Sequence, residues 1–425
     1  MKEIKYSKYD EVLYTQTLPN GFQIFVLPKP GFAKISAAMN VHFGSLDSEF
    51  MLGDRLIQQP AGIAHFLEHQ LFDKKGYDVS QIFANNGADV NAFTSYTKTS
   101  YTMATTVNGY QNLATLVSFV TSPYFTDDNI SKEKGIITQE IGMYQDDPEN
   151  QLYVKTIQNM YSKTTLADDV AGSVESIQQI TKNDLKLAYT SFYRPTNMNL
   201  FVTGNLAPEK VFEVVSQNFN SEVANEVGQH IYTKKIADLM PESNITTMHK
   251  PIFYPKFAIG IRGNDIVESK RTGLKYEIAV SMALDLFFAE TATTYNQLFH
   301  QNLLDDSFNY EFENEVGFHF AILMGNADDP KQTITALKSV LTEINQKLPQ
   351  MKNEFELQKK ELIGNYLAMM DSENAIVSQF DNNDDFSSTI FDELSIINEL
   401  TFTDFVTITQ PFWQNASYTV TIVEP

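Results

Sequence analysis

The sequence contains no cysteine, which excludes disulfides, thiolate zinc sites and cysteine nucleophiles and leaves any metal site to histidines and carboxylates. Its uncharged apolar runs are short, and none reaches the roughly 18 residues that a membrane span requires. Positive charge is scarce, with 31 Lys and Arg against 53 Asp and Glu and a formal net charge of −22. Because phosphate binding needs clustered Lys and Arg, we expect neither nucleic acid nor an anionic membrane surface as a partner.

The length of 425 residues exceeds what one ordinary hydrophobic core supports, so two domains are expected. With 43% hydrophobic and 20% charged residues, the composition is that of a globular protein. The first ten residues are charged and lack the apolar segment of a secretory signal. Together with the absence of cysteine, which is compatible with a reducing compartment, this favours a cytoplasmic location.

The residues that carry the most chemical information are His65, Glu68 and His69, in the order H-x-x-E-H. On a helix, positions three and four apart share a face, so both imidazoles can reach one metal ion while Glu68 stands beside it as a base. The alternative is that the two histidines are merely packed or solvated. With only seven histidines in the chain, this arrangement favours a zinc site.

A catalytic zinc ion normally takes three protein ligands and keeps a fourth position open, so a third ligand must come from elsewhere in the chain. A helix predicted over 127–145 offers Glu133 and Glu140, which lie seven residues apart and therefore on one face. From the residues alone, this pair could equally be an exposed ridge of a surface helix.

Turn residues and apolar periodicity predict an alternation of strands and helices in the first half of the chain. The helix that carries the H-x-x-E-H motif is predicted to begin at Pro60, after a loop over 46–60. Strands are predicted over 22–27, 34–43, 88–95, 100–106 and 197–204, and further helices over 77–85, 109–121, 127–145, 150–162 and 182–192.

The end of this first half recurs later in the chain at a constant offset of 220 residues, which indicates a duplicated architecture. Ile180-Thr181 matches Leu400-Thr401, and Phe192-Tyr193 matches Phe412-Trp413. The sequence therefore predicts two similar α/β halves, residues 1–221 and 246–425, joined by a linker over 222–245. Residues 283–290, which match the motif helix, contain no histidine, so we expect only the first half to bind metal.

The motif order in this chain resembles the pitrilysin, or insulinase, family of zinc peptidases, and in particular its bacterial branch that is similar to the mitochondrial processing peptidase. The resemblance rests on H-x-x-E-H, on Asn91-Ala92-Phe93-Thr94-Ser95 and on the Glu-x6-Glu helix. It implies an α+β fold of two homologous α/β halves, each a mostly antiparallel sheet covered by helices, that form half of a clam-shell. It also implies an endopeptidase with one Zn²⁺ ion that cleaves unfolded peptides or leader segments.

Carried over residue by residue, the resemblance implies that His65, His69 and Glu140 bind the metal and that Glu68 is the general base. Glu133 matches a glutamate that supports the site without binding metal. The resemblance further implies that Asn91, Ala92 and Phe93 belong to an edge strand that receives the substrate as an additional strand.

One departure from the family pattern concerns the second half, where active single-chain members place an Arg and a Tyr that grip the substrate. No arginine follows Arg271, although Tyr310 is a candidate for the Tyr. We therefore expect a dimer, with a related subunit that lacks the zinc motif supplying the missing contacts. The alternatives to a peptidase are a non-catalytic scaffold or assembly subunit and a metal-binding regulator without turnover.

Overall fold

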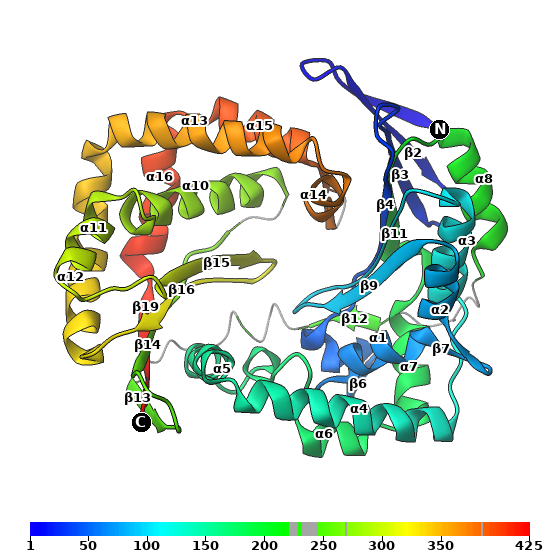
Figure 1. The fold of residues 1–425 in the computed structure, drawn as a ribbon, viewed down its shortest axis with the longest axis horizontal. Coiled ribbons are helices and arrows are strands. Elements are labelled where there is room, and N and C mark those ends of the chain that lie inside the picture. The colour runs from blue at the N-terminus through cyan, green and yellow to red at the C-terminus, as the bar shows by residue number, and fades with distance from the viewer. Residues whose placement is uncertain (221–227, 232–235, 237–244, 268–269, 384–385) are drawn as a thin grey trace. The chain divides into compact units, whose positions relative to one another are not determined.

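The structure is a computed structural model that describes residues 1–425 except 221–227, 232–235, 237–244, 268–269 and 384–385. The chain forms two compact units (Figure 1). Unit 1 comprises Met1–Ile141, Asp168–Tyr232 and Met369–Asn382, and unit 2 comprises Gly142–Ala167, Thr233–Ala368 and Asn383–Pro425. The units thus interleave along the sequence instead of following each other, and most of the predicted linker over 222–245 lies outside the described residues.

Unit 1 is built on a seven-stranded sheet with the order β1-β2-β3-β11-β4-β10-β9. Strands β3 and β11 are parallel, and the other neighbours pair antiparallel. The strand bounds are β1 Lys2–Tyr6, β2 Glu11–Thr17, β3 Gln23–Pro28, β4 Ile35–Val41, β9 Ala88–Thr94, β10 Thr99–Thr105 and β11 Met198–Gly204.

Unit 2 repeats this arrangement in a five-stranded sheet with the order β13-β19-β14-β16-β15. Here β13 and β19 are parallel and the other pairs antiparallel, so the five strands match β3-β11-β4-β10-β9 of unit 1 one by one. The duplication predicted from the 220-residue offset is therefore confirmed. The bounds are β13 Ile245–His249, β14 Lys256–Arg262, β15 Asn309–Glu315, β16 Phe318–Asn326 and β19 Ser417–Glu424.

Helices cover both sheets. Those of unit 1 are α1 Ile63–Phe72, α2 Val79–Asn85, α3 Gly109–Val120, α4 Asp127–Asp146, α6 Val174–Gln179, α7 Lys182–Phe192, α8 Pro208–Asn218 and α14 Glu373–Ser378, with the end of α4 counted in unit 2. Those of unit 2 are α5 Pro148–Met160, α10 Arg271–Phe288, α11 Thr293–His300, α12 Pro330–Lys347, α13 Lys352–Met369, α15 Ile390–Glu399 and α16 Phe402–Asn415. No helix among the described residues is long and apolar enough to cross a membrane.

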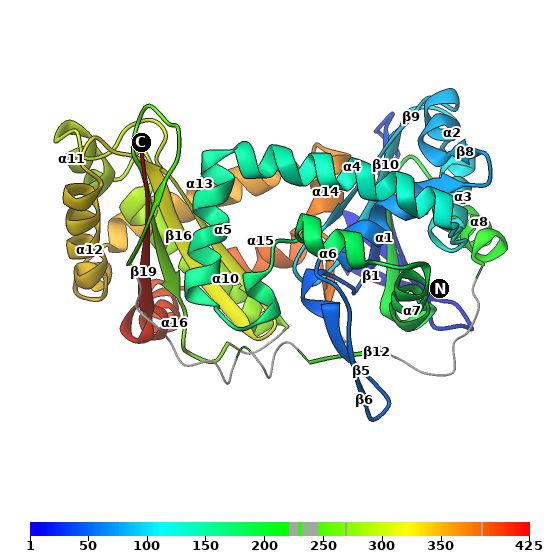
Figure 2. The ribbon, with the colours of Figure 1, turned by 90° about the horizontal axis from the view of Figure 1, so that it is seen from below.

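The remaining elements are short. The strands are β5 Glu49–Leu52, β6 Arg55–Gln58, β7 Asp73–Lys74, β8 Tyr77–Asp78, β12 Gly228–His230, β17 Asp381–Asn383 and β18 Phe386–Ser388, and the 3-10 turns are Ser45–Ser48, Thr165–Ala167, Pro195–Asn197 and Leu348–Gln350. Strands β5 and β6 form a hairpin that projects from unit 1 (Figure 2), and β12 pairs with β5.

One face of each sheet is covered by a helix from a distant part of the sequence. In unit 1, α14 packs on β4 and β11, opposite the face that carries α1 and α3 (Figure 1). The ring of Phe380, just after α14, lies 4.8 Å from that of Phe25 and 4.5 Å from that of Phe201. In unit 2, α5 packs on β14 and β19 so closely that a Cβ atom on Gly260 would lie 2.8 Å from side-chain atoms of Thr156 and Met160. These helices explain why the units interleave.

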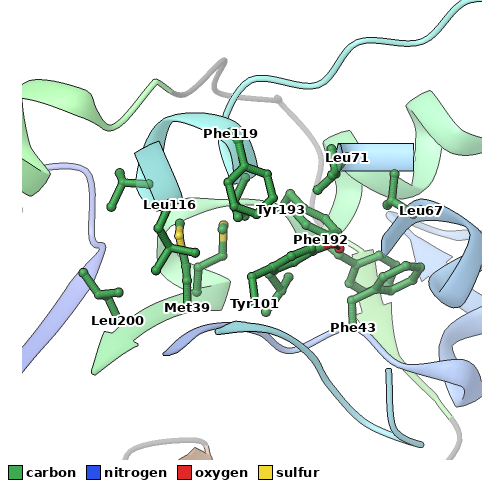
Figure 3. Packing of buried hydrophobic residues seen from close by; sticks show 14 of the residues in the cluster. Met39, Phe43, Leu67, Leu71, Tyr101, Leu116, Phe119, Phe192, Tyr193 and Leu200 are labelled. Carbon is green, nitrogen blue, oxygen red and sulfur yellow. Dashed lines mark hydrogen bonds between the residues drawn. The ribbon is translucent and has the colours of Figure 1, made fainter. Parts of the chain in front are cut away.

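The core of unit 1 lies between its sheet and helices α1, α3 and α7. Phe43 stacks on Phe192 with ring centroids 4.6 Å apart, and the buried hydroxyls of Tyr101 and Tyr193 form a 2.7 Å hydrogen bond. Leu67 of α1 and its neighbour Leu71 close this cluster (Figure 3). The apolar side of α1 is thereby anchored, which fixes the direction in which its polar side chains point.

Most predicted elements are present within one or two residues of their expected ends, but the predicted start of the motif helix and the predicted loop before it are wrong. The motif helix begins at Ile63 rather than Pro60, because Gly62 takes a left-handed conformation with φ of 85°. The predicted loop over 46–60 contains the β5–β6 hairpin. No element is predicted before residue 22, and the β1–β2 pair found there shows only weak alternation, because Leu13 is its one buried residue.

Candidate metal centre

Helix α1 presents the H-x-x-E-H motif because its other residues are held in the core. Its buried apolar side chains leave His65 and His69 partly exposed on the opposite side and Glu68 almost fully buried between them. The two imidazole rings lie with their centroids 4.6 Å apart. The spacing thus brings both rings to one side of the helix, as the sequence predicts.

Helix α4 runs beside α1 (Figures 1 and 2) and is fixed by Ile130, Ile137 and Ile141, which are buried. This packing turns the face with Glu133 and Glu140 towards α1. Glu133 is itself buried, and its Oε1 lies 2.9 Å from Nδ1 of His69. The alternative of an exposed ridge on a surface helix therefore does not describe this pair.

Three side chains converge with ligand atoms within 4.8 Å of one another: His65, His69 and Glu140. The Nε2 atom of His65 lies 3.7 Å from Oε1 of Glu140, and the Nε2 atom of His69 lies 3.6 Å from Oε2. Ligands at about 2.0–2.1 Å from a tetrahedral zinc ion are roughly 3.4 Å apart, so this donor set fits zinc with small side-chain adjustments. Because the Glu133 carboxylate accepts the Nδ1 proton of His69, the Nε2 atom is left to bind metal.

The two histidines differ in their tendency to take up a proton. Burial lowers the pKa of His65 to about 3, with a further contribution from neighbouring His69, so its imidazole is neutral near pH 7. For His69, burial also disfavours the charged ring, but the hydrogen bond that its Nδ1 donates to Glu133 and the charges of Glu68, Glu133 and Glu140 outweigh burial and raise the pKa. Of the two rings, His69 is therefore the one that takes up a second proton more readily, in competition with a metal ion.

Glu68 is held by a residue that the sequence analysis did not assign to the site. The hydroxyl of Thr94, at the end of β9, donates a 2.6 Å hydrogen bond to Oε2 of Glu68. Burial raises the pKa of Glu68, and this hydrogen bond opposes the rise. The sequence offers one indication of this contact, the alternation along β9, which puts Thr94 on the same face of the strand as Ala92. Alternation does not show that α1 packs against that face.

The predicted substrate-binding residues of the first half lie on β9, the last strand of the unit 1 sheet. Among the described residues β9 pairs with one strand, β10, so its other edge has no strand beside it. Asn91 and Phe93 point to the exposed face, with Phe93 49% exposed, and Ala92 is half-buried. These three residues thus occupy the edge position that the prediction requires.

Tyr310 lies on β15 in unit 2, and its hydroxyl donates a 2.8 Å hydrogen bond to Oδ1 of Asp285. Gln358 donates to the other oxygen of the same carboxylate at 2.8 Å.

Asp285 is 220 residues after His65, so in unit 2 an acid engaged by two hydrogen bonds takes the place of the first histidine. The one group of His, Asp and Glu side chains suited to a metal among the described residues is that of unit 1.

Comparison with known families places two models on this chain. The model described as "Insulinase (Peptidase family M16)" matches residues 33–174, which contain the H-x-x-E-H motif and both glutamates of α4. The model described as "Peptidase M16 inactive domain" matches residues 179–362. The three converging residues, His65, His69 and Glu140, all lie within the first match and none lies within the second.

Individual relatives agree with this result along the whole chain. A Bacillus subtilis protein described as the uncharacterized zinc protease YmfH is 35% identical over 420 residues, which cover 96% of either chain. A crystal structure of an M16-like peptidase from Alicyclobacillus acidocaldarius has a TM-score of 0.86 at 26% identity, covering 99% of this chain and all of that one. A protease from Helicobacter pylori, with a TM-score of 0.79 at 17% identity over 97% of this chain and 99% of its own, shares the fold.

Proposed function

Because the chain belongs to the insulinase family, peptidase family M16, we propose that it is a zinc-dependent endopeptidase that cleaves unfolded peptides or leader segments. The observation that carries this proposal is the convergence of His65, His69 and Glu140 next to a buried acid, Glu68. Two imidazoles, one carboxylate and an adjacent base form the set of groups that metal-assisted hydrolysis requires.

Each residue of the site has a distinct role in this proposal. His65, His69 and Glu140 hold one zinc ion, and Glu133 orients His69 through its Nδ1 atom. When bound, zinc supplies Lewis acidity, which makes water acidic and polarises a peptide carbonyl. Glu68 accepts the proton of the attacking water on Oε1, because Oε2 is engaged by Thr94, and then delivers it to the leaving amine.

The substrate adds to β9 as an antiparallel or parallel strand in this proposal. Main-chain hydrogen bonds along Asn91, Ala92 and Phe93 give affinity that depends little on sequence, while side chains that alternate along the strand provide selectivity. Such binding requires an extended peptide, which is why we propose unfolded segments rather than folded proteins as substrates.

A comparison of the wild-type chain with Glu68→Gln tests the proposed activity. Both proteins are purified from a host lysate together with any partner that they retain, loaded with zinc and assayed on a peptide library. We expect both to bind about one zinc ion, and the variant to lose at least 100-fold in turnover because general-base catalysis contributes roughly 10²–10⁴-fold. Equal turnover of the two proteins, or none in the wild type, would instead support the scaffold or regulator alternative.

We also propose that a second subunit completes the substrate site. The sequence has no arginine after Arg271, and in unit 2 the hydroxyl of Tyr310 is already engaged by Asp285. A related subunit without the zinc motif would provide the cationic contact in a heterodimer. We further propose that the protein works in the cytoplasm, in keeping with its lack of cysteine. Full activity of the purified chain as a monomer would refute the need for a partner.

A further inference from the structure

We infer that Thr94 is a positioning residue, which holds the general base Glu68 from the same strand that receives the peptide and so links substrate binding to catalysis. This inference rests on the proposed peptidase function. Its basis is the 2.6 Å hydrogen bond from Oγ1 of Thr94 to Oε2 of Glu68, which joins the end of β9 to the middle of α1.

The direction of this hydrogen bond follows from a count of hydroxyl protons. Thr94 Oγ1 also lies 3.4 Å from Oγ1 of Thr99, which is fully buried. The Thr99 hydroxyl donates its only proton to the carbonyl oxygen of Phe43, at 2.8 Å, since a carbonyl can only accept. Thr99 therefore has no proton left for Thr94. An ionised carboxylate can only accept and lies closer to Thr94 Oγ1 than Thr99 does, so the proton of Thr94 is directed to Glu68, and this hydrogen bond persists when the other carboxylate oxygen takes up a proton.

The backbone around Thr94 is firmly placed. Thr94 pairs with Thr99 across β9 and β10, and Ser95 donates a 2.8 Å backbone hydrogen bond to the carbonyl of Lys98, which closes the turn between the strands. The branched side chain of threonine has few rotamers, so a fixed backbone also fixes its hydroxyl. Thr94 thus gives Glu68 a rigid anchor that does not belong to its own helix.

The link to substrate binding follows from the position of Thr94 on β9. Residues on one face of a strand alternate, so Ala88, Val90, Ala92 and Thr94 face α1, while Asn91 and Phe93 face the other way. A peptide that pairs with the outer edge of β9 restrains the backbone that carries Thr94. Binding of the peptide therefore also restrains the base, and loss of the hydroxyl should lower kcat more than it changes KM.

The experiment compares Thr94→Val, which keeps the shape but loses the hydroxyl, with Thr94→Ser, which keeps the hydroxyl. Thr115→Val is the matched control, because the hydroxyl of Thr115 donates to the carbonyl of Gln111 within helix α3, away from the metal centre. With the zinc-loaded protein, we expect Thr94→Val to lower kcat about tenfold or more, with KM within about twofold and zinc content unchanged. Thr94→Ser should restore most of kcat, and Thr115→Val should match the wild type.

A double variant with both Thr94→Val and Glu68→Gln shows whether Thr94 acts by positioning Glu68 or whether its loss disturbs the fold in general. Because Thr94 acts through Glu68, it should lower the residual turnover of Glu68→Gln by less than twofold. A Thr94→Val enzyme with wild-type kcat, a Thr94→Ser enzyme as slow as Thr94→Val, or a full additional loss in the double variant would overturn the inference. In these cases the proposed function still stands if Glu68→Gln alone is inactive, whereas a fully active Glu68→Gln would overturn both.

Discussion

His65 and His69 lie one helical turn apart, yet their surroundings prepare them differently for metal. The His65 imidazole is neutral near pH 7, whereas carboxylates around His69 raise the pKa of that residue. Zinc and a proton compete for Nε2 of His69, so the metal affinity is coupled to pH through this residue. Glu133 therefore has two opposing effects, because it orients the ring for metal and also stabilises its protonated form.

This difference leads to a prediction about metal binding. As the pH falls through the raised pKa of His69, zinc affinity should decrease, and zinc binding near that pH should release a proton. In Glu133→Gln the pKa of His69 should fall, so the loss of affinity should move to lower pH, even if affinity at high pH drops about 10–100-fold. Competition with a chromophoric chelator across pH measures both proteins, and an identical pH midpoint would refute this role of Glu133.

For individual residues, sequence spacing predicts which side chains lie together only when those side chains belong to one helix. The spacing of His65, Glu68 and His69 predicts a shared face, and the structure has that face. The sequence is compatible with two interpretations of Glu133 and Glu140, and only the packing of α4 distinguishes them. The contact of Thr94 with Glu68 is not predicted, because it joins a strand end to a helix and no local sequence pattern indicates such a tertiary contact.

Helix α1 owes its starting point to one close contact of the backbone. Gly62 precedes the helix with φ of 85°, and a Cβ atom there would lie 2.5 Å from the carbonyl oxygen of Ala171. The hydroxyl of Ser176, in α6, donates a 2.8 Å hydrogen bond to the carbonyl of Ala61, so α6 and the residues just before it hold the beginning of α1. The prediction of a helix start at Pro60 was wrong. A proline can begin a helix but does not require one to begin there, whereas the left-handed Gly62 packed against Ala171 sets the start at Ile63.

Alanine substitutions of two glycines should therefore have opposite effects on stability. Gly62→Ala should lower the free energy of unfolding by about 1–3 kcal/mol, because a left-handed alanine is strained and its Cβ meets the Ala171 carbonyl. Gly135→Ala, within α4, should raise it by about 0.5–1 kcal/mol, because its Cβ meets no atom within 4 Å and alanine favours helices. Urea unfolding of both metal-free variants measures this, and an unchanged Gly62→Ala would contradict it.

The whole chain combines a repeat that the sequence predicts with an interleaving that it does not. The 220-residue offset predicted two similar halves, and the strand orders of the two sheets confirm it. The offset also relates α5 to the region of α14, but it contains no information about the sheet on which either helix packs. That choice depends on contacts such as those of Phe380 with Phe25 and Phe201.

Interleaving predicts that the two sequence halves do not fold well when made separately. A fragment of residues 1–221 lacks α14 and therefore exposes Phe25 and Phe201, which are buried in the intact chain. Exposure of each ring should lower the free energy of unfolding by about 2 kcal/mol. We expect this fragment to bind a hydrophobic dye and to unfold at low urea, whereas the full chain cut once between 222 and 245 should remain folded as one particle. A fragment that unfolds cooperatively at the urea midpoint of the intact protein would contradict this interleaved organisation.

The central claim is that His65, His69 and Glu140 bind the same zinc ion. Anomalous X-ray scattering at the zinc absorption edge, from crystals of the zinc-loaded protein, tests it most directly. We predict one strong peak, at about 2.0–2.2 Å from Nε2 of both histidines and from a carboxylate oxygen of Glu140, with one further position open to solvent. A peak elsewhere, or a Glu140 carboxylate turned away from an ion that the two histidines hold, would contradict the claim.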